Sequence, residues 1–164
     1  MGGDALNNNP ILFLDIDGVV LPGRAYTLPN QTFDPFVTIF DPCSVSLLNE
    51  ACKSAGFKIV LHSSWIRTKF IDILPRGDVV AHCINQGIKA EYFHPTDPYC
   101  NRDISYRYDR IKEWLNRHPE AEDNFVILDD ESTPEGDPLE RYLIQTNFDE
   151  GITLEVRRKL YYFE

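Results

Sequence analysis

The sequence predicts an α/β domain in which helices pack on both faces of a mainly parallel, doubly wound sheet. Three short apolar runs, at residues 11–16, 57–61 and 125–128, have the length of strands that are buried on both faces. Residues between the first two runs show the apolar spacing of a helix. Because strand, helix, strand is the unit of a parallel sheet, these observations favour this fold class.

The best-marked helix is predicted at residues 42–55. Asp41 suits the N-cap and Pro42 the first helical position. Apolar side chains then recur at helical spacing, at Val45, Leu48, Cys52 and Ala55. Gly56 can end the helix, because glycine adopts the left-handed conformation without a steric penalty.

Weaker patterns predict the elements between the second and third strands. Residues 66–74 and 79–86 are expected to form short helices, the second ended by Gly87, and residues 90–105 to be irregular. A further helix with one apolar face is expected before Pro119, and its apolar residues are Tyr108, Ile111, Trp114 and Leu115.

The last part of the sequence adds one strand and one helix to this prediction. Residues 143–145 form a short apolar segment that suits an outer strand. Thr153 can cap a last helix, in which Leu154, Leu160 and Tyr161 are expected to be partly buried.

Length and composition favour a single intracellular domain. The chain has 164 residues, and we expect residues 1–9 to be a flexible lead-in and residues 10–164 to form one domain. The sequence shows no secretory signal and no apolar run that would cross a bilayer, so a cytoplasmic location without a membrane partner is expected. The four cysteines form no C-x-x-C pair and are expected to be reduced. A net charge of −10 argues against general binding of duplex DNA.

Polar clusters follow each of the three predicted strands. In chain order they are Asp15, Asp17 and Gly18, then Ser63 and Ser64, then Asp129 and Asp130. Since ligands of open parallel sheets bind beyond the carboxyl ends of the strands, these clusters are expected to meet at one edge. Converging carboxylates repel one another unless a cation lies between them, and Mg²⁺ prefers oxygen ligands while keeping positions for water and phosphate. The sequence therefore predicts a Mg²⁺ site at this edge.

The segments around these clusters resemble the motifs of the haloacid dehalogenase-like (HAD) superfamily. LDIDGVV resembles its first motif, VLHSS its second, and VILDD its fourth in the paired-aspartate form. Smaller segments, SSW, YRYDRIKEWL, LDDES and TNFDEGIT, are similar to the compact HAD domain of Swiss army knife RNA-repair proteins. The resemblance implies a Rossmann-like doubly wound fold. A minimal cap is expected, because residues 21–58 and 65–106 do not contain the elements of an independent cap.

This resemblance implies catalytic roles for the two aspartates of the first motif. Asp15 is expected to attack phosphorus and form an aspartyl-phosphate. Asp17 is expected to protonate the leaving oxygen and then to deprotonate the attacking water. The metal site implied contains Asp15, Asp17 through its backbone carbonyl, Asp130 and Asp129. Within this site, Asp129 is expected to orient the metal or to pair with a cationic residue.

Binding of the substrate phosphate is expected to involve Ser63, Ser64 and a cation at the start of the helix before the third strand. Arg107 is favoured for this cation by the motif order, and Arg110, one turn further on, competes with it. The resembled branch commonly has Arg directly after the Trp of SSW. Here Ile66 intervenes, so Arg67 is given no role.

Other residues are interpreted as structural or left open. His62 precedes Ser63, but strand alternation directs the two side chains to opposite faces, so a packed histidine is expected rather than a ligand. Aromatic residues gather near Arg102 and Arg107, at Tyr92, Phe93, Tyr99, Tyr106 and Tyr108. Such a set suits stacking on a nucleobase, and it equally suits a loop that packs its own aromatic rings.

The function predicted from these observations is Mg²⁺-dependent hydrolysis of a phosphate monoester. A nucleotide or the terminal phosphate of a nucleic acid is the expected substrate class, and a small phosphorylated metabolite stays open. The alternatives are a phosphomutase or phosphotransferase of the same superfamily, a phospho-receiver, and a phosphate-binding module without activity. In a receiver the acidic pair precedes the phosphorylated Asp, whereas Asp129 and Asp130 come last here.

Overall fold

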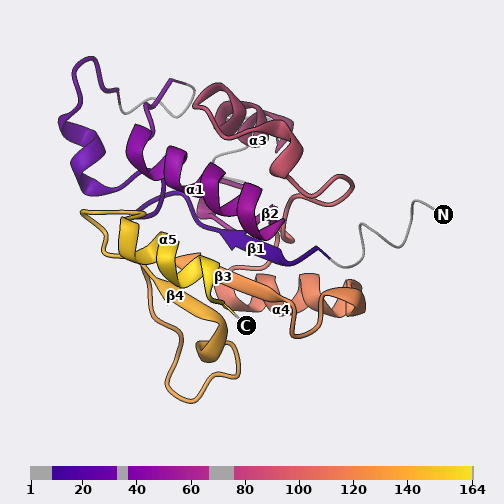
Figure 1. The fold of residues 1–164 in the computed structure, drawn as a ribbon. Helices are drawn as coiled ribbons and strands as arrows, with labels where there is room; N and C mark the ends of the chain where they lie inside the picture. The colour runs from indigo at the N-terminus through magenta and orange to yellow at the C-terminus, as the bar shows by residue number, and fades with distance from the viewer. Residues whose placement is uncertain (1–8, 33–36, 67–75, 164) are drawn as a thin grey trace.

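The computed structural model describes residues 9–32, 37–66 and 76–163, and these contain one four-stranded sheet (Figure 1). Its strands, all parallel, are β1 (Ile11–Leu14), β2 (Lys58–Leu61), β3 (Phe125–Asp129) and β4 (Leu143–Gln145). They lie in the order β2-β1-β3-β4, so β1 is central. The predicted α/β fold with a parallel sheet is confirmed.

Four helices surround this sheet in the described residues: α1 (Pro42–Ala55), α3 (Arg76–Asn85), α4 (Arg107–Arg117) and α5 (Leu154–Tyr161). Short 3₁₀ helices are η1 (Gly23–Thr27), η2 (Ser64–Ile66), η3 (Ala90–Tyr92), η4 (Pro119–Ala121) and η5 (Glu140–Tyr142). In the described part of the segment between β2 and α4 the regular elements are η2, α3 and η3, which agrees with a minimal cap. No helix of the described residues is both long and apolar enough to cross a membrane.

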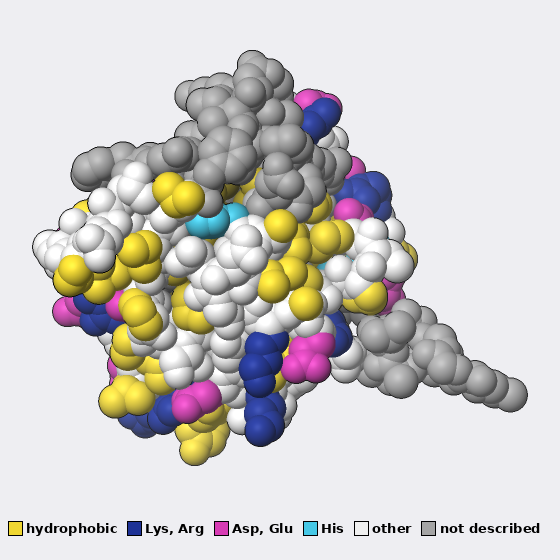
Figure 2. Space-filling model, turned by 90° about the horizontal axis from the view of Figure 1, so that it is seen from above, with side chains coloured by type: hydrophobic (Ala, Val, Ile, Leu, Met, Phe, Trp, Pro, Cys, Tyr) yellow, Lys and Arg dark blue, Asp and Glu magenta, His cyan; other side chains and the backbone are white. Residues whose placement is uncertain are grey.

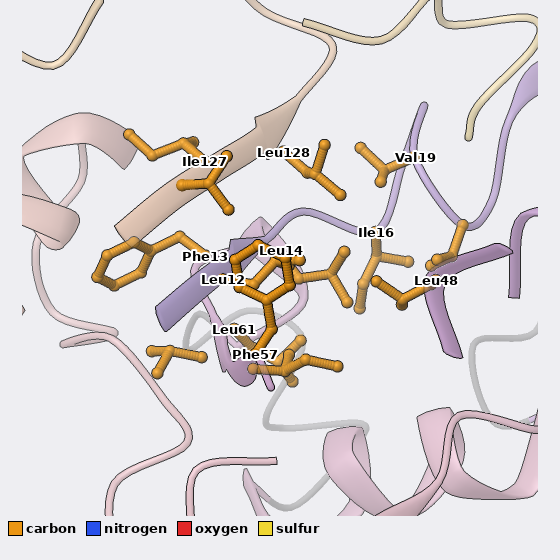
Figure 3. Packing of buried hydrophobic residues seen from close by; sticks show 14 of the residues in the cluster. Leu12, Phe13, Leu14, Ile16, Val19, Leu48, Phe57, Leu61, Ile127 and Leu128 are labelled. Carbon is orange, nitrogen blue, oxygen red and sulfur yellow. The ribbon is translucent and has the colours of Figure 1, made fainter. Parts of the chain in front are cut away.

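The hydrophobic core is centred on β1, whose side chains are all buried (Figure 3). Phe13 packs edge-to-face on Trp114 of α4, with ring centroids 5.4 Å apart, which places α4 on one face of the sheet. Helices α1 and α5 pack against each other, and Figure 1 shows α1 and α4 on opposite sides of β1. Because both faces are covered, the strands are apolar throughout and carry their polar residues only at their ends.

Helix α1 begins and ends where its capping residues predict. The Asp41 carboxylate accepts a hydrogen bond from the Ser44 N–H at 3.0 Å, and Pro42 is the first helical residue. Gly56 adopts the left-handed conformation, with φ of 76°, and its N–H bonds the Cys52 carbonyl.

Several sequence predictions differ from the structure in detail. The first strand ends at Leu14 rather than at residue 16, because one further bond to β3, from the Asp15 N–H, is followed by a turn that begins at Ile16. Helix α3 covers residues 76–85 instead of 79–86, and the helix predicted at 66–74 lies outside the described residues from residue 67 onwards. Leu154 was expected to be partly buried, but it is 65% exposed. It is the first residue of α5, and Val156 and Leu160, which are four positions apart, form the buried face.

Candidate active site

The carboxyl ends of β1, β2 and β3 bring the predicted polar residues together. Leu14 is in register with Leu61 and Leu128, so the next residues along the three strands are Asp15, His62 and Asp129. The Asp15 N–H donates to the Leu128 carbonyl at 3.1 Å, and the His62 N–H donates to the Leu14 carbonyl at 3.2 Å. The strand pairing therefore continues into the site and fixes the position of Asp15.

Arg107 is the cation that reaches these carboxylates. It is the first residue of α4, and its Nη1 donates to Asp15 Oδ2 at 3.1 Å and to Asp129 Oδ1 and Oδ2 at 2.8 and 2.7 Å. Burial lowers the pKa of Arg107, but the charges of Asp129 and Asp15 outweigh this and raise the pKa. Arg107 is thus held as a fixed positive charge beside Asp15.

The competing residue, Arg110, donates hydrogen bonds to backbone carbonyl groups. Its side chain is buried and donates to the carbonyls of His62, Ile104 and Ser105. These bonds join α4 to the end of β2 and to the segment that precedes α4. Arg110 therefore fixes the position of the helix from which Arg107 extends.

Asp129 is the anion that holds Arg107. Besides Arg107, its carboxylate accepts the Glu131 N–H at Oδ1, 2.9 Å, and has His62 Nε2 at 2.8 Å from Oδ2. Burial raises the pKa of Asp129, but the bonds from His62 and the charge of Arg107 outweigh burial and lower the pKa. Asp129 is therefore ionised, and its lone pairs are largely taken up by these donors.

Asp17 lies two residues after Asp15 and is held by an indole. Trp65 of η2 donates its Nε1–H to Asp17 Oδ2 at 3.1 Å. Burial raises the pKa of Asp17, and this rise is opposed by the Trp65 hydrogen bond and the Arg107 charge. A carboxyl group with a raised pKa is suited to exchange a proton during catalysis.

Three carboxyl groups lie close enough to share a cation. Asp15, Asp129 and Asp130 each offer an oxygen, and these oxygens lie within 4.8 Å of one another. Burial and the Asp129 charge raise the pKa of Asp15, and they raise the pKa of Asp130 to about 6. A divalent cation would offset the repulsion between these like-charged carboxylates, and all the atoms that could bind it are hard oxygen ligands. The residues present therefore fit Mg²⁺.

Gly18 is required by the close approach of Asp130. It has φ of +76°, and a Cβ atom there would lie 2.5 Å from Asp130 Cγ and 2.6 Å from Oδ2. The Gly18 carbonyl also accepts the Thr146 hydroxyl at 2.7 Å. The turn after β1 is thus packed directly against the side chain of a candidate metal ligand.

We expect Gly18→Ala to displace the Asp130 carboxylate and to weaken Mg²⁺ binding by about 10-fold or more. Gly136→Ala is the matched control, because Gly136 has φ of +78° and a Cβ there would meet nothing within 4 Å. Both variants carry a backbone strain of roughly 1–2 kcal/mol. Only in Gly18→Ala does the new Cβ atom contact a candidate metal ligand, Asp130. Titration of Mg²⁺ by calorimetry distinguishes them, and equal affinities would contradict this account of Gly18.

The comparison with known families agrees with this geometry. The family model described as the HAD domain in Swiss Army Knife RNA repair proteins matches residues 11–156. The chain belongs to this family. No curated protein and no solved structure shows significant similarity to the chain.

In this HAD domain the two serines of the second motif lie beside Trp65. Ser63 is buried, and its Oγ accepts the Trp65 N–H at 3.2 Å. Ser64 is half-buried and begins η2. The predicted role of both serines in binding phosphate stays a prediction.

The aromatic set of the HAD domain is mostly internal. Tyr92, Phe93, Tyr99 and Tyr108 are buried, while Tyr106, which precedes α4, is 41% exposed. The structure thus favours the interpretation that this segment packs its own rings. Arg67 lies outside the described residues.

Two side chains contact the site although the sequence did not predict a role there for either, His62 and Trp65. His62 is packed, as expected, but it also contacts Asp129. Trp65 belongs to the SSW segment, and its contact with Asp17 carries no sequence signature beyond that segment. For His62 a signal existed: if the strands are in register, the residue after Leu61 lies beside Asp15 and on the same face.

Proposed function

We propose that this HAD domain is a Mg²⁺-dependent phosphomonoesterase that works through an aspartyl-phosphate at Asp15. The observation that carries the proposal is the surroundings of the Asp15 carboxylate. Asp15 is 3% exposed, and its carboxylate accepts a hydrogen bond from Arg107. The Asp130 carboxylate lies close enough for the two groups to bind the same cation. A nucleophile, a fixed positive charge and a hard-oxygen metal site are the elements that phosphoryl transfer needs.

In the first step, an Asp15 oxygen attacks phosphorus and forms a P–O bond to the enzyme. The bond from phosphorus to the leaving oxygen breaks, and Asp17 gives that oxygen a proton. Arg107, together with Ser63 and Ser64, offsets the charge on the transferred group. The Trp65 hydrogen bond holds Asp17 in place for this transfer.

In the second step, water attacks phosphorus and Asp17 accepts its proton. The P–O bond to Asp15 breaks, so inorganic phosphate leaves and both carboxyl groups return to their first state. When bound, Mg²⁺ would supply positive charge to the phosphoryl oxygens. Asp15, Asp130 and the Asp17 backbone carbonyl would hold it, while Asp129 is largely occupied by Arg107, His62 and the Glu131 N–H.

The substrate class that we propose is a nucleotide or a nucleic acid with a terminal phosphate. Support comes from the family description, which names RNA repair, and from the small content of regular elements between β2 and α4 in the described residues. On the face shown in Figure 2, Lys and Arg side chains lie beside Asp and Glu side chains. This mixture of signs, together with the net charge of −10, argues against binding of a long duplex. We place this activity in the cytoplasm.

A panel of phosphate monoesters tests this function. It should contain an aryl phosphate, nucleotides, sugar phosphates, and oligonucleotides with 3′- or 5′-phosphates, each assayed with Mg²⁺ and with EDTA. We expect Mg²⁺-dependent release of phosphate, with kcat/KM higher for oligonucleotide ends than for sugar phosphates. A stable phosphoprotein after treatment with acetyl phosphate, without turnover of any ester, would instead indicate a receiver. Transfer of the phosphate to an added sugar would indicate a phosphotransferase.

A further inference from the structure

We propose that His62 is a positioning residue that orients Arg107 for phosphate binding by fixing the Asp129 carboxylate between them. This inference rests on the proposed function, because Arg107 is taken as the phosphate-binding cation. The sequence predicted only a packed histidine at position 62, whereas the structure shows a defined contact between its imidazole and Asp129.

The strand order makes this contact possible. His62 follows β2 and Asp129 ends β3, and β1 lies between them. Neighbouring strands are about 4.8 Å apart, so the two backbones are separated by about 9.6 Å at this level. The imidazole reaches across the end of β1, on the face from which Asp15 also extends, and meets Asp129 Oδ2 at 2.8 Å. A shorter side chain at residue 62 would not span this gap.

The protonation of the ring follows from what surrounds it. The side chain of His62 is fully buried, and its Nδ1 has no hydrogen-bond partner among the described residues. An unpaired buried N–H of a charged ring costs more than an unpaired neutral nitrogen. A neutral ring with its proton on Nε2 therefore explains why Nδ1 can be buried without a partner and why Nε2 lies beside Asp129. In this form the Nε2–H donates to the Asp129 carboxylate.

The consequence reaches Arg107 through Asp129. Arg107 Nη1 lies between Asp15 Oδ2 and the two Asp129 oxygens, and its Nη2 is 3.3 Å from Glu131, whose carboxylate is exposed. The direction of the guanidinium thus depends mainly on how Asp129 is turned. His62 holds Oδ2, and the Glu131 N–H holds Oδ1, so the carboxylate cannot rotate away from Arg107. Loss of the His62 donor would leave one of these two restraints.

Three substitutions of His62 test the proposal. Gln carries an amide N–H at about the reach of Nε2, Asn carries one only at about the reach of Nδ1, and Leu carries none. We measure binding of inorganic phosphate in the presence of Mg²⁺ by calorimetry. His62→Leu and His62→Asn should weaken phosphate binding by about 10-fold, the usual effect of a lost bond to a charged group. His62→Gln should stay within about 3-fold of the unsubstituted protein, and Mg²⁺ affinity should change less than phosphate affinity.

The matched control is Phe57→Leu, a core change just before β2 at the other end of the sheet, which lowers stability without touching the site. His62→Asn keeps a polar group, so it serves if His62→Leu does not fold. If Phe57→Leu weakens phosphate binding as much as His62→Asn at equal thermal stability, the role of His62 is only structural. If His62→Gln binds as poorly as His62→Asn, the Nε2 donor is not what matters, and the proposal is overturned.

A double-mutant cycle with Arg107→Gln isolates the pathway. If His62 acts through Arg107, His62→Asn should have no further effect on phosphate binding once Arg107 is replaced. Additive effects would overturn the proposal. Since these measurements follow binding, they are separate from turnover: failure of every ester to react would refute the proposed activity but would leave the role of His62 to be decided by the cycle.

Discussion

Replacing Asp15 by Asn should abolish phosphatase turnover and leave the protein folded. The amide keeps the shape of the side chain but has no charge with which to attack phosphorus, so a loss in kcat on the order of 10⁴-fold or more is expected. The fold should tolerate the change, because burial and the Asp129 charge raise the pKa of Asp15 and make its ionised form costly. Steady-state kinetics with an aryl phosphate, together with thermal unfolding, measure both effects.

Asp109→Asn is a suitable control for Asp15→Asn. Asp109 is an exposed residue of α4, so the substitution changes the net charge equally without reaching the sheet. We expect its kcat to remain within about 2-fold of the unsubstituted value. Near-normal turnover by a folded Asp15→Asn protein would show that another group attacks phosphorus.

Removal of the metal is the second change with a large expected effect. EDTA should stop turnover, and added Mg²⁺ should restore it, because the carboxylates around Asp15 repel one another and the substrate phosphate without a cation. Asp130→Asn should raise the Mg²⁺ concentration needed for half-maximal activity by about 10- to 100-fold. Full activity in excess chelator would refute the metal site.

The pH dependence follows from the pKa of Asp130, which burial and the Asp129 charge raise to about 6. Mg²⁺ binds the ionised carboxylate, so protons compete with it, and the measured Mg²⁺ affinity should fall as the pH drops below about 6. The stability of the metal-free protein should respond in the opposite sense. Because the pKa is higher in the folded state than its ordinary 3.8, this group favours folding at low pH, and that contribution is lost as the pH rises through about 6. Calorimetric Mg²⁺ titrations and chelator-treated unfolding curves between pH 5 and pH 8 check both trends, and affinity that does not vary with pH would contradict them.

Local signals in the sequence predicted much of the fold. Helix α1 was bounded correctly because Asp41, Pro42 and Gly56 act within a few residues of its ends. The strands were found because β1, β2 and β3 are buried on both faces and so have no polar residues in their interiors. The exposure of Leu154 was not predictable in the same way, since the direction in which the first turn of α5 points depends on its packing against α1.

The members of the candidate site were predicted better than their contacts. Strand ends identified Asp15, Asp129 and Asp130, and the order of motifs favoured Arg107 over Arg110. The bonds from His62 to Asp129 and from Trp65 to Asp17 were not foreseen, because each joins elements that are distant in sequence. Once the strands are aligned, register places His62 beside Asp15, but it does not identify Asp129 as the partner of the imidazole. The Trp65 bond depends on where η2 lies, which leaves no local pattern in the amino acids.

The central place of β1 also has a consequence for how the chain is made. Arg107 and Asp15 are 92 positions apart, and His62 and Asp129 are 67 positions apart. The ribosome therefore releases β1, α1 and β2 long before β3. In the sheet, β2 pairs with one edge of β1 and β3 with the other edge. Until β3 is released, β1 has an unpaired apolar edge, which is the kind of edge that joins strands of other chains. The arrangement that places the nucleophile between two strands thus leaves the nascent chain exposed to aggregation until about residue 129 has emerged.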